Sequence, residues 1–161
     1  LNGHMLLDYP IQTFSECSEI DRLIIVVPEN YCSEIQKEYP EHSVVSGSSS
    51  RKESAFKGLL ACPPETEKVL IHDAARALVD TATIIRCING LNEAKAISTV
   101  VPTKDTVVET NENIIVKIPN RSRTYLEQTP QGFHYQTILK AHTNFQVDTT
   151  DDIRLVFEMG I

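Results

Sequence analysis

The chain has 161 residues, of which 41% are hydrophobic and 23% charged, an ordinary balance for one globular domain with a buried core. Its net charge of -7 argues against a nucleic-acid partner, because such proteins normally present a broad basic face. No apolar run approaches the about 20 residues that cross a membrane, so no membrane partner is expected either. The four cysteines form neither C-x-x-C pairs nor clusters with histidine, which predicts reduced thiols in a cytoplasmic protein.

The first two thirds of the chain alternate between apolar runs and segments with helical periodicity. Strands are predicted at residues 23–28, 43–45, 68–73 and 97–102, and helices at 29–39, 51–61 and 81–96. The expected inward residues are Ala55, Phe56, Leu59 and Leu60 in one helix and Ile84, Ile88 and Leu91 in another. This alternation predicts right-handed crossovers and a parallel sheet with helices on both faces.

The pattern changes after residue 104. Two β-rich runs within 105–119 flank the polar sequence TNEN, which predicts a hairpin. Helices are predicted at 135–145 and from about Thr150 to Gly160, where the glycine is a plausible C′ residue. We therefore predict a single α/β domain over 1–161 with a hairpin arm.

The predicted strand at 68–73 runs into His-Asp-Ala-Ala-Arg. Ligands bind beyond the carboxyl ends of strands in open parallel sheets, so Asp73 is a candidate Mg²⁺ ligand there. Ala74 and Ala75 leave room for a ligand, and Arg76 is a candidate phosphate contact. The alternative is that Asp73 caps the next helix and Arg76 is a solvated side chain. His72 is expected to be packed rather than to act as a base.

Three polar segments are further candidates. The turn at 47–54 is rich in small residues, so it predicts either an anion-binding loop, with Arg51 and Ser54 on a nucleotide, or an ordinary loop with serine caps. Residues 119–133 end in a Thr-Pro-Gln sequence, in which Thr129 is a candidate donor or part of a rigid turn into the next helix. Residues 149–152 predict a helix start with a threonine cap and acids in the first turn.

The order of these motifs is more specific than any one of them. The motifs are, in order, G-x-x-x-R-x-x-S, HDAAR, KDT, NR, QTPQGF and TDD with E-x-G. Through these motifs the chain resembles, over the whole of 1–161, the cytidylyltransferases that act on methylerythritol phosphate and their relatives acting on ribitol phosphate. The resemblance implies a Rossmann-like, mostly parallel sheet of the nucleotide-diphospho-sugar transferase type. It also implies a homodimer in which a β-arm, residues 103–121, reaches the partner's site.

The implied reaction is transfer of CMP from CTP to 2-C-methyl-D-erythritol 4-phosphate, with release of pyrophosphate, in isoprenoid precursor synthesis. HDAAR and TTDD resemble this branch of the family. IPNRS resembles the branch that makes CDP-ribitol from ribitol 5-phosphate, which is one alternative. Others are a non-catalytic relative and an enzyme of the same fold that uses another nucleotide.

The resemblance also implies roles for single residues. Asp73 would bind Mg²⁺. The cytidine part would be held by Gly47, Ser48, Ser49, Ser54 and Ala74. The second substrate would meet Arg76, Thr106 and Arg121, with Thr129 and Thr150 lining its pocket, and the catalytic residues would be Arg76, Arg121 and Thr129.

The chain departs from the family pattern at both ends. The family begins with a Gly-rich loop that carries an arginine, followed by a Pro-Lys-Gln-type segment, and it continues to a second metal-binding aspartate and a lysine. This chain holds neither part, so we expect a domain truncated at both ends that by itself binds CTP weakly and turns over poorly. Within the chain, Ser48 and Ser49 replace a usual Gly-Gly or Gly-Asp, and Ala77 replaces a usual proline.

Overall fold

The computed structural model describes residues 3–145, 149 and 151–161. The helices are α1 (Asp8–Ser15), α2 (Cys32–Glu38), α3 (Arg51–Leu60), α4 (Thr81–Gly90), α5 (Tyr135–Asn144) and α6 (Asp152–Phe157), with 3-10 turns η1 (Glu29–Tyr31) and η2 (Arg121–Arg123). The strands are β1 (Ile24–Val27), β2 (Ser43–Ser46), β3 (Lys68–Ile71), β4 (Ala96–Pro102), β5 (Glu109–Asn111), β6 (Ile114–Lys117) and β7 (Tyr125–His134).

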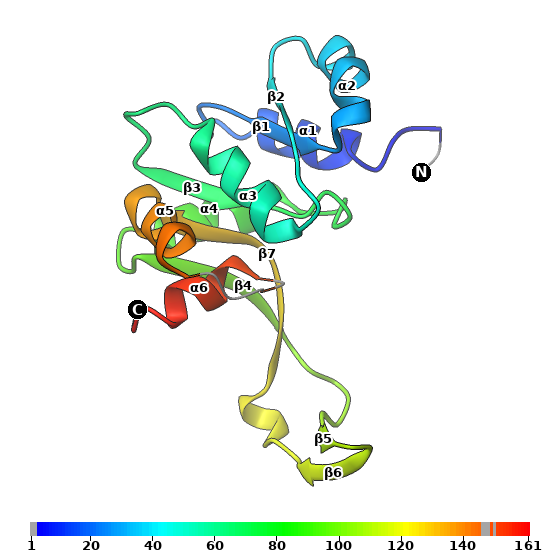
Figure 1. The fold of residues 1–161 in the computed structure, drawn as a ribbon, viewed down its shortest axis with the longest axis vertical. Helices are drawn as coiled ribbons and strands as arrows, with labels where there is room; N and C mark the ends of the chain where they lie inside the picture. Colours follow the sequence, from blue (N-terminus) through cyan, green and yellow to red (C-terminus); the bar gives the residue numbers. More distant parts are fainter. Residues whose placement is uncertain (1–2, 146–148, 150) are drawn as a thin grey trace.

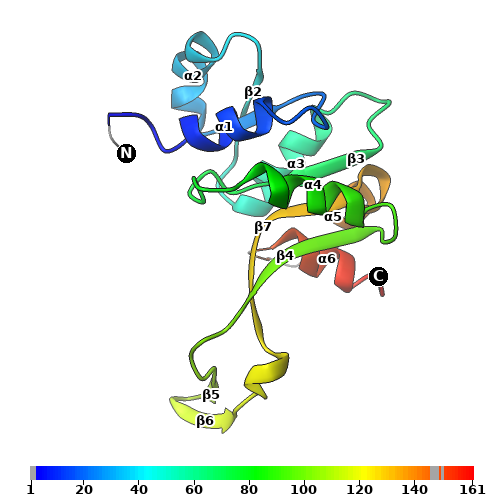
Figure 2. The same ribbon diagram turned by 180° about the vertical axis from the view of Figure 1, so that it is seen from behind.

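The body of the protein has helices on both faces of its strands, as predicted (Figure 1). β1 and β2 pair in parallel. β7 lies between β3 and β4 and is antiparallel to both, so β3 and β4 run in the same direction. Helices α3, α5 and α6 lie on one side of this layer, and Figure 2 shows α1 and α4 on the other. None of the described helices is long and apolar enough to cross a bilayer.

Strand β7 corrects the prediction of a turn at Thr129–Pro130. Proline lacks the N–H that a strand ladder needs, which is why the sequence predicts a turn there. The ladder between β4 and β7 shifts register between its Ser98–Gln131 and Val100–Glu127 pairs, so Pro130 lies in this irregularity. Its carbonyl accepts a hydrogen bond from the Thr99 hydroxyl at 2.8 Å, which satisfies the group outside the ladder.

Some details of the helices differ from the sequence analysis. Helix α1 was not predicted, although its Ile11 and Phe14 are buried. Leu60 was expected to face inward and is exposed, because the buried face of α3 is centred on Leu59. The main core instead joins α3, α5, α6 and β7 through residues that include Leu59, Phe133, Ile138, Leu155 and Val156. All four cysteines are free thiols.

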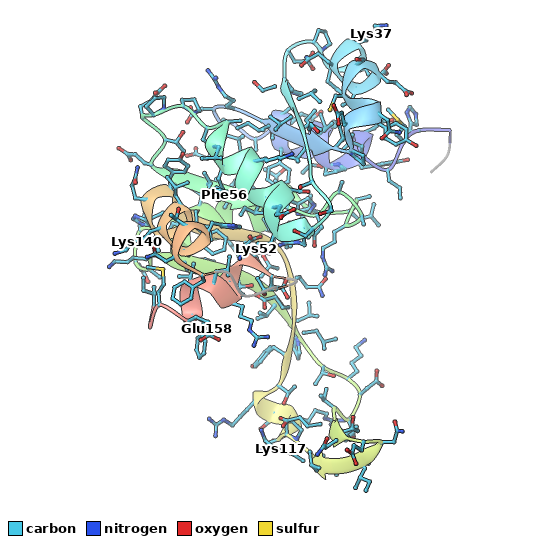
Figure 3. All side chains as sticks on the ribbon, in the orientation of Figure 1. Lys37, Lys52, Phe56, Lys117, Lys140 and Glu158 are labelled. Atoms are coloured by element: carbon cyan, nitrogen blue, oxygen red, sulfur yellow. The ribbon has the colours of Figure 1, made fainter. Side chains whose placement is uncertain are left out.

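The predicted hairpin is confirmed as β5 and β6, which form the end of an arm that projects from the body (Figures 1 and 2). Its turn places Glu112 and Asn113 at φ values of 47° and 67°, in the left-handed region that such tight hairpin turns require. At the base of the arm the Thr103 amide donates to the Thr124 carbonyl, 3.3 Å away. Figure 3 shows Lys117 on the arm, far from Lys52 and Phe56 on the body.

Candidate functional site

The end of β3 delivers Asp73 to the edge of the sheet. Its backbone amide donates to the Thr129 hydroxyl at 3.1 Å, and its carbonyl accepts from the Arg76 amide at 2.9 Å, which closes a turn. The next helix, α4, is capped by Asp80, whose carboxylate accepts from the Thr83 amide at 2.6 Å. Asp73 is therefore not a helix cap, and its side chain remains 36% exposed.

Two arginines flank the Asp73 carboxylate. Arg51 Nε donates to Oδ1 at 3.1 Å, and Arg76 Nε lies 3.7 Å from Oδ2. Arg76 also donates to the side-chain oxygen of Gln128 on β7. The predicted neighbourhood of Asp73 and Arg76 is thus present, whereas Arg51, expected to contact a nucleotide, pairs with carboxylates in this structure.

The second carboxylate bound by Arg51 belongs to Asp152, which the sequence indicated only as a first-turn acid of α6. Asp152 is buried and accepts from Arg51 Nη1 at 2.6 Å and from His142 Nε2 at 2.8 Å. Burial alone raises the pKa of Asp152, but the hydrogen bond from His142 and the charge of Arg51 outweigh it, so the pKa lies below its ordinary value. The weak signal for this cluster was His142, which falls on the buried stripe of α5, four residues after Ile138.

Asp152→Asn is expected to lower the free energy of unfolding at pH 7 by about 3 kcal/mol, because it leaves buried partners unpaired. A depressed folded-state pKa contributes stability above the unfolded value of about 3.9, and this stability is lost as pH falls through the folded value. The difference between the two proteins should therefore be constant near neutrality and shrink below about pH 4. Urea unfolding at a series of pH values measures it, and an unchanged difference in acid would contradict the pairing.

His72 and Thr129 form a hydrogen-bonded support beneath Asp73. His72 Nε2 lies 3.1 Å from the Arg76 carbonyl, which only accepts, so Nε2 carries the proton. Nδ1 then accepts from the Thr129 hydroxyl at 3.1 Å, and the same hydroxyl accepts from the Asp73 amide. Burial lowers the pKa of His72, although its bond to the Arg76 backbone and the charge of Asp73 act in the opposite direction. His72 is a packed, neutral histidine, as predicted.

Thr129 is only 6% exposed, so its hydroxyl supports Asp73 from within. Thr129→Val removes that hydroxyl and leaves the Asp73 amide and His72 Nδ1 without it, at an expected cost of about 2 kcal/mol. Thr129→Ser keeps the hydroxyl and should cost about half as much through the lost methyl group. Urea denaturation of the two variants measures the difference. A smaller loss in Thr129→Val than in Thr129→Ser would mean that the methyl group, and not the hydrogen bonds, carries the role.

The predicted nucleotide turn is built from the interactions of its own serines. Ser50 caps α3 by accepting from the Glu53 amide at 3.1 Å, and Ser48 and Ser49 donate to the Glu53 carboxylate. The Ser54 hydroxyl accepts from the Ser48 amide at 2.9 Å. Ser50 therefore caps α3, as the serine-cap interpretation of this loop predicted.

The loop also lies beside Asp73, because Arg51 at the start of α3 contacts that carboxylate. A Cβ on Gly47 would come within 3.0 Å of the Ser54 hydroxyl, so this position favours glycine. Ala74, the remaining residue expected at the nucleotide, is exposed next to Asp73.

The residues expected to bind the second substrate are divided between body and arm. Thr106 and Arg121 are exposed on the arm, where Arg121 Nη1 donates to the Lys104 carbonyl at 3.3 Å. The arm extends away from the body that holds Asp73 (Figure 1), so one chain does not bring these groups together. Thr150, also expected in this pocket, lies outside the described residues.

The Asp73 carboxylate fits a magnesium ion that takes most of its ligands from elsewhere. Within residues 3–145, 149 and 151–161, no group of three His, Cys, Asp or Glu side chains could hold a metal ion. Mg²⁺ is commonly held by one or two carboxylates, with substrate phosphates and water completing its shell. One partly exposed carboxylate beside two arginines is compatible with that arrangement.

Comparison with known proteins identifies the family. The family model described as IspD, 2-C-methyl-D-erythritol 4-phosphate cytidylyltransferase, matches residues 1–161. Curated enzymes of that name are 32% identical in Streptomyces coelicolor and 34% identical in Desulforamulus reducens, over 100% and 99% of this chain. The chain spans 66% and 73% of their respective lengths.

A solved structure, 4-diphosphocytidyl-2C-methyl-D-erythritol synthase from Anaerococcus prevotii, matches with a TM-score of 0.92 and 30% identity, over 99% of this chain and 74% of that one. The names of these relatives favour the methylerythritol branch indicated by HDAAR and TTDD over the ribitol branch. The match also confirms the predicted fold class, including its nucleotidyltransferase type. The chain belongs to the IspD family of cytidylyltransferases, which are nucleotidyltransferase enzymes.

Proposed function

We propose that the protein transfers CMP from CTP to 2-C-methyl-D-erythritol 4-phosphate and releases pyrophosphate. The observation that carries the proposal is the match of the whole chain to a family named for this reaction. The position of the HDAAR motif adds to it, since Asp73 and Arg76 lie together where a strand ends, the usual place for a ligand in this class of fold.

The reaction needs no protein nucleophile, because a phosphate oxygen of the polyol phosphate attacks the α-phosphate of CTP. The protein has to align the two substrates and offset their negative charge. Asp73 would hold Mg²⁺, which neutralises phosphate charge when bound. Arg76 would supply positive charge beside it, held in place by Gln128. The turn at Gly47–Ser49, together with Ser54 and Ala74, would bind the cytidine part. Thr129 keeps Asp73 in place from within.

The binding site for the second substrate would be completed by a partner chain. The arm exposes Ile114, Ile115, Val116 and Ile118, each more than half accessible. An isolated two-stranded hairpin is at best marginally stable in water. A row of exposed apolar side chains on it favours burial against another protein surface. A homodimer that buries these residues would carry Thr106 and Arg121 to the partner's Asp73 site. Thr150 would then line the pocket for the polyol phosphate, with Thr129 supporting Asp73 beneath it.

The test is a pyrophosphate-release assay with CTP and Mg²⁺, run in parallel with methylerythritol phosphate and ribitol phosphate. The assay should be run on this chain and on a longer version that includes any residues encoded before and after it. Turnover with methylerythritol phosphate alone is expected. Turnover with ribitol phosphate alone would assign the other branch, and no turnover with either substrate by the longer version would refute the proposed activity.

Base specificity has its own readout. A ligand at 100 times its Kd stabilises the folded state by about 2.7 kcal/mol, so thermal unfolding with CTP, UTP and ATP compares the three nucleotides directly. CTP is expected to raise the melting temperature most. A larger shift with UTP or ATP would overturn the cytidine assignment and favour another nucleotide enzyme on the same fold.

A further inference from the structure

Arg51 joins an exposed carboxylate to a buried one. Its Nε donates to Asp73 Oδ1 at 3.1 Å, and its Nη1 donates to Asp152 Oδ2 at 2.6 Å. The first carboxylate is 36% exposed and the second 1% exposed. One guanidinium thus links the start of α3, the end of β3 and the start of α6, three segments that are distant in the sequence.

The buried end of this link is firmly held. Asp152 uses one carboxylate oxygen for Arg51 and the other for His142, whose Nε2 lies 2.8 Å away. His142 has no exposed side-chain surface, and Phe56 of α3 stacks on its ring with centroids 5.5 Å apart and planes inclined by 7°. Figure 3 shows Phe56 on α3 next to α5. Asp152 therefore acts as an anchor, because both of its oxygens are occupied inside the protein.

The exposed end leaves one oxygen of Asp73 open. Arg51 occupies Oδ1, whereas no hydrogen bond from the described residues reaches Oδ2, and Arg76 Nε lies 3.7 Å from it. Carboxylates that ligate metals are commonly oriented by a hydrogen bond to their second oxygen, and removing such a partner typically weakens metal binding by about 10- to 100-fold. The link from His142 through Asp152 and Arg51 has the form of such a support.

We propose that Arg51, anchored by Asp152 and His142, is a positioning residue that orients the Asp73 carboxylate for a divalent cation. The inference rests on the proposed function, since it assumes that Asp73 holds the ion. Lysine cannot replace Arg51 in this role, because its single ammonium group lacks the planar fork whose nitrogens reach both carboxylates. Arg51→Lys therefore preserves the charge beside Asp73 and removes the link.

The test measures binding of Mn²⁺, a spectroscopic substitute for Mg²⁺, in the presence of CTP by the loss of the free-ion electron paramagnetic resonance signal. Arg51→Lys is expected to raise the Kd for Mn²⁺ by about 10-fold. Arg86→Lys is the matched control, since Arg86 lies on the surface of α4 and contacts Thr83. The Kd of this variant for Mn²⁺ should equal that of the wild type. In turnover assays Arg51→Lys should raise the metal concentration needed for half-maximal rate without changing the KM for the polyol phosphate.

A double-mutant cycle tests the anchor. If Asp152 acts through Arg51, Asp152→Asn should weaken Mn²⁺ binding in the wild type and have little further effect in Arg51→Lys. Additive effects would overturn the link. If Asp152→Asn does not fold, Asp152→Glu takes its place in the cycle. Glutamate keeps the negative charge but moves the carboxylate relative to Arg51. All titrations are made well below each variant's melting temperature, so that a loss of stability alone does not alter the Kd.

The outcomes separate this inference from the function on which it rests. If Asp73→Asn abolishes Mn²⁺ binding and Arg51→Lys does not change it, the positioning role is refuted and the cytidylyltransferase proposal stands. If Mn²⁺ binding does not depend on Asp73 at all, the metal assignment and the positioning role fail together. Weakened binding in Arg51→Lys with an unchanged Arg86→Lys supports the role.

Discussion

Asp73→Asn is expected to lower Mg²⁺-dependent pyrophosphate release by about 100-fold or more while the protein stays folded. An amide keeps the size of the side chain and removes the charge that a hard cation needs. The loss of stability should be small, because the ion pairs of Asp73 with Arg51 and Arg76 are partly exposed and such pairs contribute little. The rate is measured at saturating CTP over a range of Mg²⁺ concentrations, and the fold by thermal unfolding.

Asp80→Asn is the matched control. The same chemical change is made seven residues away, at the cap of α4, and asparagine is about as good a cap as aspartate. This variant should keep both its rate and its melting temperature. If Asp73→Asn retained the wild-type rate, Asp73 would be a structural residue of the turn after β3, and the metal would have to be assigned elsewhere.

Mixing two impaired variants, Asp73→Asn and Arg121→Ala, is expected to restore activity. Asp73→Asn damages the site on the body, and Arg121→Ala damages the arm that we propose reaches the partner's site. In a mixed dimer one site receives both defects and the other receives neither. Random pairing of equal amounts makes half of the dimers mixed, so about a quarter of wild-type activity should return. The measurement is the pyrophosphate-release rate after the two variants are exchanged.

Arg121→Ala by itself should raise the KM for the polyol phosphate far more than that for CTP, because the arm is proposed to hold only the second substrate. Arg123→Ala is its control, since it removes another exposed cation from the same 3-10 turn. No recovery on mixing, in variants that demonstrably exchange chains, would contradict a site shared between two subunits. Equal effects of Arg121→Ala on both KM values would contradict the role of the arm.

Local pattern was sufficient for much of the fold. Apolar runs and helical periodicity depend only on neighbouring residues, and they located β1, β2, β3, β4, α2 and α3 to within a few residues. The helix predicted at 81–96 begins where expected but ends at Gly90, six residues early. The polar residues of TNEN were sufficient to predict the hairpin turn. Strand β7 was missed because Pro130 and the polar residues Gln128 and Gln131 resemble a loop. Only pairing with two other strands buries Pro130 and Gln131.

The sequence by itself determined the family and the place of Asp73, because motif order and the end of an apolar run are properties of the linear chain. It did not determine what surrounds Asp73. Thr129 reaches the Asp73 amide from 56 residues away, and Arg51 reaches Asp152 across 101 residues. Contacts of that separation arise only when β7 enters the sheet and α6 packs against α5. The tertiary structure therefore decided which groups hold the candidate metal ligand, and it placed the arm too far from the body for one chain to complete the site.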